Sequence, residues 1–162
     1  MAIITYQKFI KGASVIEILI VIAIIVIALV TLLGVAAFSL SISISVKETT
    51  KANNLAQETI EAVRNFRDGT TWNTNGLGTL NIGVSYFPQK TADNPPKWLL
   101  TQGEETINSF KRKVVFSNTQ RDTNDNIIES GGTNDPNTKK VTVTVSWQDK
   151  KVEIVTYLTN WR

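Results

Sequence analysis

Hydrophobic and polar positions divide the chain into an apolar first part and an alternating remainder. Residues 18–46 are 29 consecutive uncharged positions between Glu17 and Lys47, and about 20 apolar residues suffice to cross a bilayer. From Ile18 to Leu33 the run is apolar on every helical face, whereas a core helix keeps a polar stripe. The pattern therefore predicts a membrane-spanning helix.

The apolar helix is expected to continue into an amphipathic segment. Apolar residues there recur at spacings of three and four, which indicates one buried helical face; they are Leu55, Ala56, Ile60, Val63 and Phe66. One helix from about Ala13 to Arg67 would be about 80 Å long. Gly34 and the serine-rich SLSISIS stretch lower helix propensity, so a bend there and an unbroken helix are both open. Gly69 predicts the C-terminal end, followed by a loop over 68–79.

The remainder predicts an antiparallel sheet. Five runs alternate or are rich in β-branched residues, as strands are; they are 80–87, 98–101, 110–117, 140–147 and 152–158. The short polar connection 148–151 predicts a hairpin between the last two. The polar stretch 118–140 is expected to be a long loop, either mobile or functional. The fold class is therefore α+β, with a long N-terminal helix packed against a C-terminal antiparallel sheet.

One face of the predicted strand 140–147 carries its apolar side chains. Val141, Val143, Val145 and Trp147 alternate with threonine and serine, and alternate side chains point to opposite faces of a sheet. This face is expected to meet the amphipathic part of the helix, and the other face to meet water.

Charge adds little to this organisation. The net charge is +3, of which Lys8 and Lys11 contribute +2, so the rest of the chain carries +1. Such a balance is no nucleic-acid signature. Lys8 and Lys11 precede the apolar run, and the positive-inside rule then places the long C-terminal part outside the cytoplasm. A cleaved secretory signal is disfavoured because its apolar region runs about 7–15 residues.

The chain contains no histidine and no cysteine. The commonest general base, the thiol nucleophile and the usual transition-metal ligands are therefore missing. Glu58 and Glu61 are three residues apart, a spacing typical of a solvated helix face. We expect no enzymatic activity and no cofactor.

The stretch that begins at Asp122 carries alternating oxygen ligands, as calcium loops do. It has Ile127 where such loops need glycine and Thr133 where they place a bidentate acid. A polar turn is the preferred interpretation, and no metal site is assigned.

A second candidate surface combines basic and aromatic residues, which together bind single-stranded nucleic acids in other proteins. Its members are Lys111, Arg112, Lys113, Lys139, Lys140, Lys150 and Lys151, with Trp98, Trp147 and Trp161. Alternation, however, places Lys111 and Lys113 on the strand face opposite Arg112, and exposed basic residues also discourage edge pairing. DNA is therefore a weakly supported partner.

The N-terminal residues resemble a known processing signal. The stretch KGASVIEIL, residues 11–19, is similar to the class III signal of type IV pilins and pseudopilins. In that family a membrane peptidase cuts after a glycine that follows a basic leader, the new terminus is N-methylated, and a carboxylate lies at the fifth mature position. The resemblance assigns Gly12 and Ala13 to the cut and Glu17 to the carboxylate, although phenylalanine usually stands where this chain has Ala13. Lys8 and Lys11 match the leader charge.

The resemblance implies a division of the chain and a role for each part. Residues 1–12 would be the leader, 13–46 the transmembrane and filament-core helix, and 47–162 the globular head, with a helix over 47–67 and a sheet over 80–162. Glu17 would pair with the Ala13 amine of a neighbouring subunit during assembly, since a carboxylate in a bilayer is costly and is normally kept for a partner. A glutamate that only reaches the headgroups by snorkelling is the alternative.

The resemblance also implies partners and a location. They are other pilins in a homo- or hetero-oligomer, the prepilin peptidase, the pilus assembly platform and the inner membrane. The head would lie outside the cytoplasm on a single-pass anchor, and then in an extracellular filament. The stretch 52–68, with Trp72 after it, is similar to the helix of certain minor pilins. A pseudopilin of a type II secretion or DNA-uptake machine and a non-polymerising, membrane-anchored binding protein are the alternatives.

Overall fold

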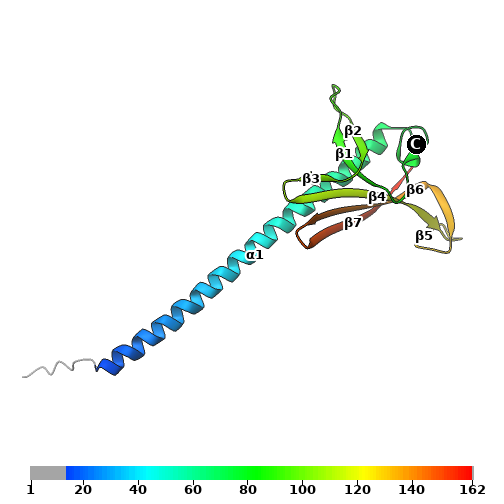
Figure 1. Cartoon of the computed structure of the whole chain (residues 1–162). Coiled ribbons are helices and arrows are strands. Elements are labelled where there is room, and N and C mark those ends of the chain that lie inside the picture. The colour runs from blue at the N-terminus through cyan, green and yellow to red at the C-terminus, as the bar shows by residue number, and fades with distance from the viewer. Residues whose placement is uncertain (1–13, 162) are drawn as a thin grey trace, which may run out of the picture. The chain divides into compact units, whose positions relative to one another are not determined.

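A computed structural model describes residues 14–161 of the chain. The first element, α1, runs over Val15–Gly69 as one helix of 55 residues, labelled in Figure 1. Helical structure is unbroken at Gly34 and through the serine-rich stretch 39–45, so the unbroken alternative is the one observed. The chain divides into two units, Met1–Val46 and Lys47–Arg162, which we describe separately.

The second unit contains the end of α1 and one antiparallel sheet of seven strands (Figure 1). The strand order is β2-β1-β4-β6-β7, and β3 and β5 also pair with β4. A short 3-10 helix, η1, precedes the sheet. The bounds are Leu77–Thr79 for η1, Ser85–Lys90 for β1, Trp98–Gln102 for β2, Glu105–Ile107 for β3, Phe110–Arg121 for β4, Ile127–Ile128 for β5, Thr133–Trp147 for β6 and Lys150–Thr159 for β7. The predicted α+β class, a long helix packed on an antiparallel sheet, is confirmed.

Two sequence predictions about the sheet are wrong. The run 80–87 does not form a strand from its start, because residues 82–83 make a turn in which Gly83 has φ +76°, and β1 begins only at Ser85. The stretch 118–140 is not a long loop. Its two ends continue β4 and β6 as paired strands, with a register shift between Asn118 and Thr119, and β5 pairs with β4 inside it.

The last hairpin is tighter than expected. Trp147 pairs with Lys150, so the turn contains two residues, Gln148 and Asp149, rather than four. Gln148 takes the positive φ of 48° that a two-residue hairpin turn requires. The predicted pairing of the last two strands is confirmed over ten residue pairs.

The core lies between the amphipathic part of α1 and one face of the sheet. Val141, Val143, Val145 and Trp147 of β6 are buried, as their alternation predicts. The strand β4 adds Phe110, Val114 and Phe116, and the rings of Phe116 and Tyr86 meet edge to face at 5.8 Å. Burying such side chains is the main stabilising contribution to the fold.

The buried face of α1 is wider than the predicted stripe. Its buried residues are Ala52, Ala56, Thr59, Ile60, Ala62, Val63 and Phe66, while Leu55 is only half-buried. The small alanines let the helix backbone approach the sheet closely. The Thr59 hydroxyl donates to the Leu55 carbonyl at 2.8 Å, which satisfies a polar group that would otherwise be costly to bury.

Enlarging a buried alanine of α1 should therefore destabilise the second unit. We expect Ala56→Leu to lower its free energy of unfolding by about 1–3 kcal/mol, because extra methylenes in a packed core force side chains and backbone to shift. The matched control is Ala37→Leu, the same change at an exposed position of the same helix, which should alter it by less than about 0.5 kcal/mol. Urea unfolding of the full chain in detergent micelles, followed by tryptophan fluorescence, measures both. Equal effects would contradict the packing described.

Candidate functional site

The first unit presents a helix surface that is apolar all round. Twenty-one large apolar side chains from Val15 to Val46 are each 48–75% exposed. No part of the most hydropathic 18-residue window of α1 is buried inside the protein. By length and composition this helix can cross a membrane. Contiguous apolar surface on this scale marks contact with lipid or with other protein chains.

Glu17 lies in the first turn of this helix. The amides of Glu17 and Ile18 donate to the Ser14 carbonyl at 2.9 and 3.2 Å, which makes Ser14 the N-cap and Glu17 the third helical residue. A carboxylate at this position is favoured by the helix dipole by about 0.3–1 kcal/mol. Within the described part of the chain the Glu17 carboxylate is exposed and makes no ion pair.

The other residues of the processing signal lie outside the described residues. These are Lys8, Lys11, Gly12 and Ala13. The structure therefore places only Glu17 and Ser14 of the N-terminal motif. Serine followed three residues later by glutamate is a known N-terminal helix pattern, and the helix does begin after Ser14.

In the second unit, polar and aromatic contacts join α1 to the end of the sheet. The Trp147 indole N–H donates to Glu48 at 3.2 Å, and the Lys51 ammonium lies 5.3 Å from the centre of the Phe110 ring. Phe110 and Trp147 also contact each other, with ring centres 5.6 Å apart. These contacts fix the helix to the sheet at the point where its buried face begins, and sequence reasoning missed the role of Glu48.

The basic and aromatic residues do not form one surface. Arg112 and Lys139 are buried, and Lys139 donates to the Asn118 side chain at 2.9 Å. Trp147 is buried, and Trp98 is partly buried against the core. The exposed face of β4 carries Lys111 and Lys113, as alternation predicts. Lys113 is paired with Glu104 at 2.6 Å.

Arg112 is a buried cation between α1 and β3. Its Nε lies 2.5 Å from Glu105 and its Nη1 lies 3.4 Å from Glu58. A buried charge is costly unless paired, and the two glutamates supply that pairing. The spacing from Glu61 predicted only that Glu58 faces solvent. Glu58 also forms an ion pair with the strand residue Arg112.

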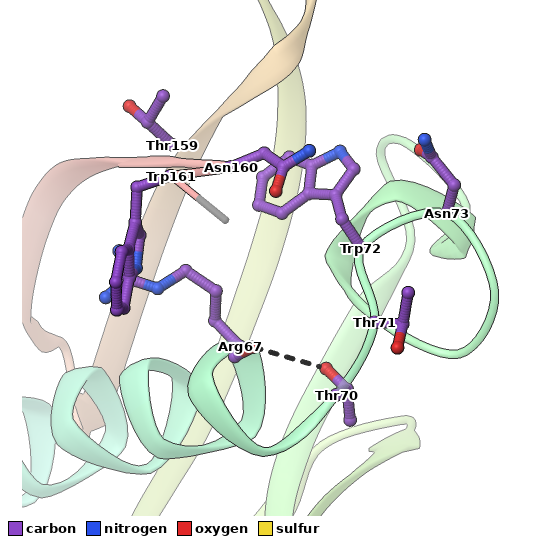
Figure 2. A pocket seen from close by; sticks show the side chains of 8 residues that line it. All are labelled: Arg67, Thr70, Thr71, Trp72, Asn73, Thr159, Asn160 and Trp161. Atoms are coloured by element: carbon purple, nitrogen blue, oxygen red, sulfur yellow. Dashed lines mark hydrogen bonds between the residues drawn. The ribbon is translucent and has the colours of Figure 1, made fainter.

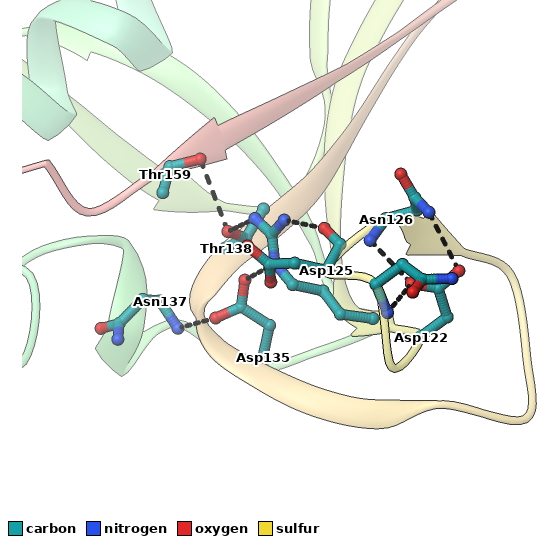
Figure 3. Close-up of polar contacts among 9 residues, drawn as sticks. Asp122, Asp125, Asn126, Asp135, Asn137, Thr138 and Thr159 are labelled. Atoms are coloured by element: carbon teal, nitrogen blue, oxygen red, sulfur yellow. Dashed lines mark hydrogen bonds and ion pairs between the residues drawn. The ribbon is translucent and has the colours of Figure 1, made fainter.

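The stretch predicted as a polar turn is one (Figure 3). One oxygen of Asp122 accepts hydrogen bonds from the amides of Asn124 and Asn126, each at 2.8 Å, and the other accepts one from the Asn126 side chain at 3.1 Å. The side-chain and backbone N–H groups of Asn126 lower the pKa of Asp122 below its ordinary value. Among residues 14–161 no group of three or more acidic side chains is arranged to hold a metal.

An ion pair joins the extended ends of β4 and β6 beside this turn. Arg121 Nε lies 2.7 Å from Asp135, and its Nη1 donates to the Asp125 carbonyl at 2.7 Å. The hydrogen bond from Arg121 lowers the pKa of Asp135. Gly132 lies in the same region, where a Cβ would overlap the Arg121 carbonyl oxygen. The strand ends are thus held by side-chain pairing and close backbone approach.

Comparisons with family models, with curated proteins and with solved structures find no match to this chain.

The Arg121–Asp135 pair predicts an acid-sensitive strand end. The pKa of Asp135 is lower in the folded protein than in the unfolded chain, where it is about 3.8. The ionised carboxylate therefore stabilises the fold fully above the unfolded pKa, and this stabilisation is lost as pH falls through the lower, folded pKa. We expect the protection factors of the amides of residues 119–121, that is, their exchange corrected for its intrinsic pH dependence, to fall in this acid range. Asp135→Asn should remove this pH dependence in hydrogen-exchange measurements, and Asp149→Asn in the hairpin turn is the control. An unchanged acid response in Asp135→Asn would contradict the assignment.

Proposed function

We propose that this chain is a structural subunit of a type IV pilus or pilus-like filament. It is inserted in the cytoplasmic membrane through α1, cut after Gly12 by a prepilin peptidase and assembled with other pilins at an assembly platform. The head, residues 47–162, then lies outside the cytoplasm and later on the outside of the filament.

The exposed apolar surface of α1 is the observation that carries this proposal. A helix with apolar side chains on every face cannot remain in water, and it has no polar face for a soluble partner. Lipid tails cover such a surface before assembly, and the same helices of neighbouring subunits cover it in a bundle. Exchange between the two is reasonable because apolar contact is kept and tight packing is added.

Glu17 supports assembly rather than simple anchoring. A plain anchor gains only about 0.3–1 kcal/mol from the helix dipole at this carboxylate, whereas burial of such a group in lipid costs about 2.5–3.5 kcal/mol. Pairing with the Ala13 amine of another copy would neutralise both charges in the filament core and would fix the axial offset between subunits. This role comes from the family resemblance and rests on cleavage after Gly12.

Processing is the first thing to measure. We expect intact-mass and N-terminal peptide mass spectrometry of the protein from its native cells to find a chain that starts at Ala13, with a methylated amine. A chain that still carries Lys8 to Gly12 would overturn the proposal and favour a membrane-anchored binding protein.

The second test removes the carboxylate. We expect Glu17→Ala to insert in the membrane normally but to reduce sheared surface filaments at least about tenfold, since breaking a buried ion pair costs about 3–5 kcal/mol. Glu61→Ala is the matched control, because Glu61 is an exposed glutamate on the same helix that pairs with nearby Arg64. Quantitative immunoblots of sheared and membrane fractions measure both.

Normal filament yield from Glu17→Ala would contradict the assembly role of Glu17. A second outcome concerns the protein without substitutions. If it is processed but absent from sheared fibres, the pseudopilin alternative is favoured, in which a short filament stays within a secretion or DNA-uptake machine.

A further inference from the structure

A cleft of about 320 Å³ lies where the end of α1, the turn after it and the end of β7 meet (Figure 2). This volume is at the lower end of the range for small-molecule sites, about 300–1,000 Å³. All of its lining residues belong to the second unit. The apolar part of α1, residues 15–46, does not contribute to it.

One wall of the cleft is an exposed aromatic ring. Trp161 is 62% exposed, and the Arg67 guanidinium carbon lies 6.0 Å from the centre of its ring. Tryptophan combines a large apolar face with a polar N–H group and is enriched at contact surfaces, so this ring offers a stacking platform at the rim of the cleft. The guanidinium beside the ring fixes its orientation.

The opposite wall is rigid. Trp72 is buried, its indole N–H donates to the Pro136 carbonyl at 3.1 Å, and its own carbonyl accepts from the Gly78 amide at 3.0 Å. Asn160 is held by two contacts with Asn137, one from its amide to the Asn137 carbonyl at 2.7 Å and one between the side chains at 3.3 Å. The cleft is therefore largely formed before any ligand arrives.

The remaining lining groups are uncharged hydrogen-bonding side chains. They are Thr70, Thr71, Asn73, Thr159 and Asn160. In the view of Figure 2, Thr71 and Asn73 lie on the far side of Trp72 from Trp161, whereas Asn160 lies beside Trp72. Amide and hydroxyl groups both donate and accept hydrogen bonds. Such a lining suits a ligand that carries several hydroxyl groups.

The charge of the cleft is largely compensated. Among residues 14–161, Arg67 is the one charged residue that lines it, and Arg67 Nε is already bonded to Asp68 at 2.8 Å. An anion would have to compete with that carboxylate for the guanidinium. The balance favours a neutral ligand over a phosphate or carboxylate.

We propose that this cleft binds a neutral saccharide. The apolar C–H face of a sugar ring would stack on Trp161, and its hydroxyl groups would bond to asparagine and threonine side chains that line the cleft, Asn160 and Thr159 among them. The proposal goes beyond filament assembly and does not rest on it, since a site in the head would act equally on a pilus, a pseudopilus or an anchored protein.

The test uses the full chain labelled with 5-fluorotryptophan, in micelles of a detergent that has neither a sugar nor a phosphate headgroup. The chain has four tryptophans, so fluorine NMR gives four signals, and Trp161→Phe assigns the one of interest. Glucose, galactose, N-acetylglucosamine and lactose are the probes. We expect at least one of them to shift the Trp161 signal saturably, with a Kd of about 1 mM, and to leave Trp98 and Trp147 unchanged.

The control experiment observes the sugar instead of the protein. Saturation transfer from unlabelled protein to the bound sugar should fall at least about tenfold in Trp161→Ala, equivalent to about 1.4 kcal/mol. It should persist in Tyr157→Ala, which removes another exposed aromatic residue on β7. No saturable shift with any of the four sugars would overturn the proposal. So would a shift of Trp161 by inorganic phosphate alone, which would make the cleft an anion site at Arg67.

Discussion

The exposed apolar surface of α1 is the constraint from which the rest of the molecule follows. Burial of an apolar side chain usually contributes about 1.5–3 kcal/mol. Even at about 1 kcal/mol for each of the twenty-one between Val15 and Val46, removal from water is worth on the order of 20 kcal/mol. A whole domain is stable by only about 5–15 kcal/mol. No interaction in the head could compensate for leaving this helix in water, so lipid or other helices must cover it.

The core of the head is complete without residues 15–46, so the head can tolerate a change from lipid to other helices around that part of α1. Every buried apolar residue of that core lies between Ala52 and Leu158, and the contacts of Glu48 and Lys51 mark where helix burial starts. Moving residues 15–46 from lipid to a bundle would therefore not remove any buried apolar side chain from the sheet. The same separation explains why the proposed sugar cleft can be tested without a filament.

The sequence predicted the parts of the fold that periodicity controls. The helix, the core-facing residues of β6 and the last hairpin follow from spacings of 3.6 and 2, which hydrophobic burial enforces. The ends of β4 and β6 were missed because they are polar on both faces and are held by backbone pairing, the Arg121–Asp135 pair and the close approach at Gly132. None of these leaves a hydrophobic pattern. The burial of Arg112 was equally hidden, since its partners Glu58 and Glu105 come from distant parts of the chain.

Glu17 meets different physical constraints in a lipid membrane and in a bundle of helices. As the third residue of α1, it gains about 0.3–1 kcal/mol from the helix dipole, which requires no second subunit. Burial of a carboxylate deep in lipid costs about 2.5–3.5 kcal/mol, so the dipole alone suffices only while Glu17 stays near the headgroups, where that cost is small. In a bundle of helices the same carboxylate would be surrounded by apolar side chains without headgroups or water within reach. There the dipole would be insufficient and a cation would be needed, and the amine that the proposed cleavage before Ala13 would release is such a cation. Under the proposed function the carboxylate would thus be tolerable in the membrane and would need a partner only in the filament, which is the behaviour expected of a residue that controls when subunits join.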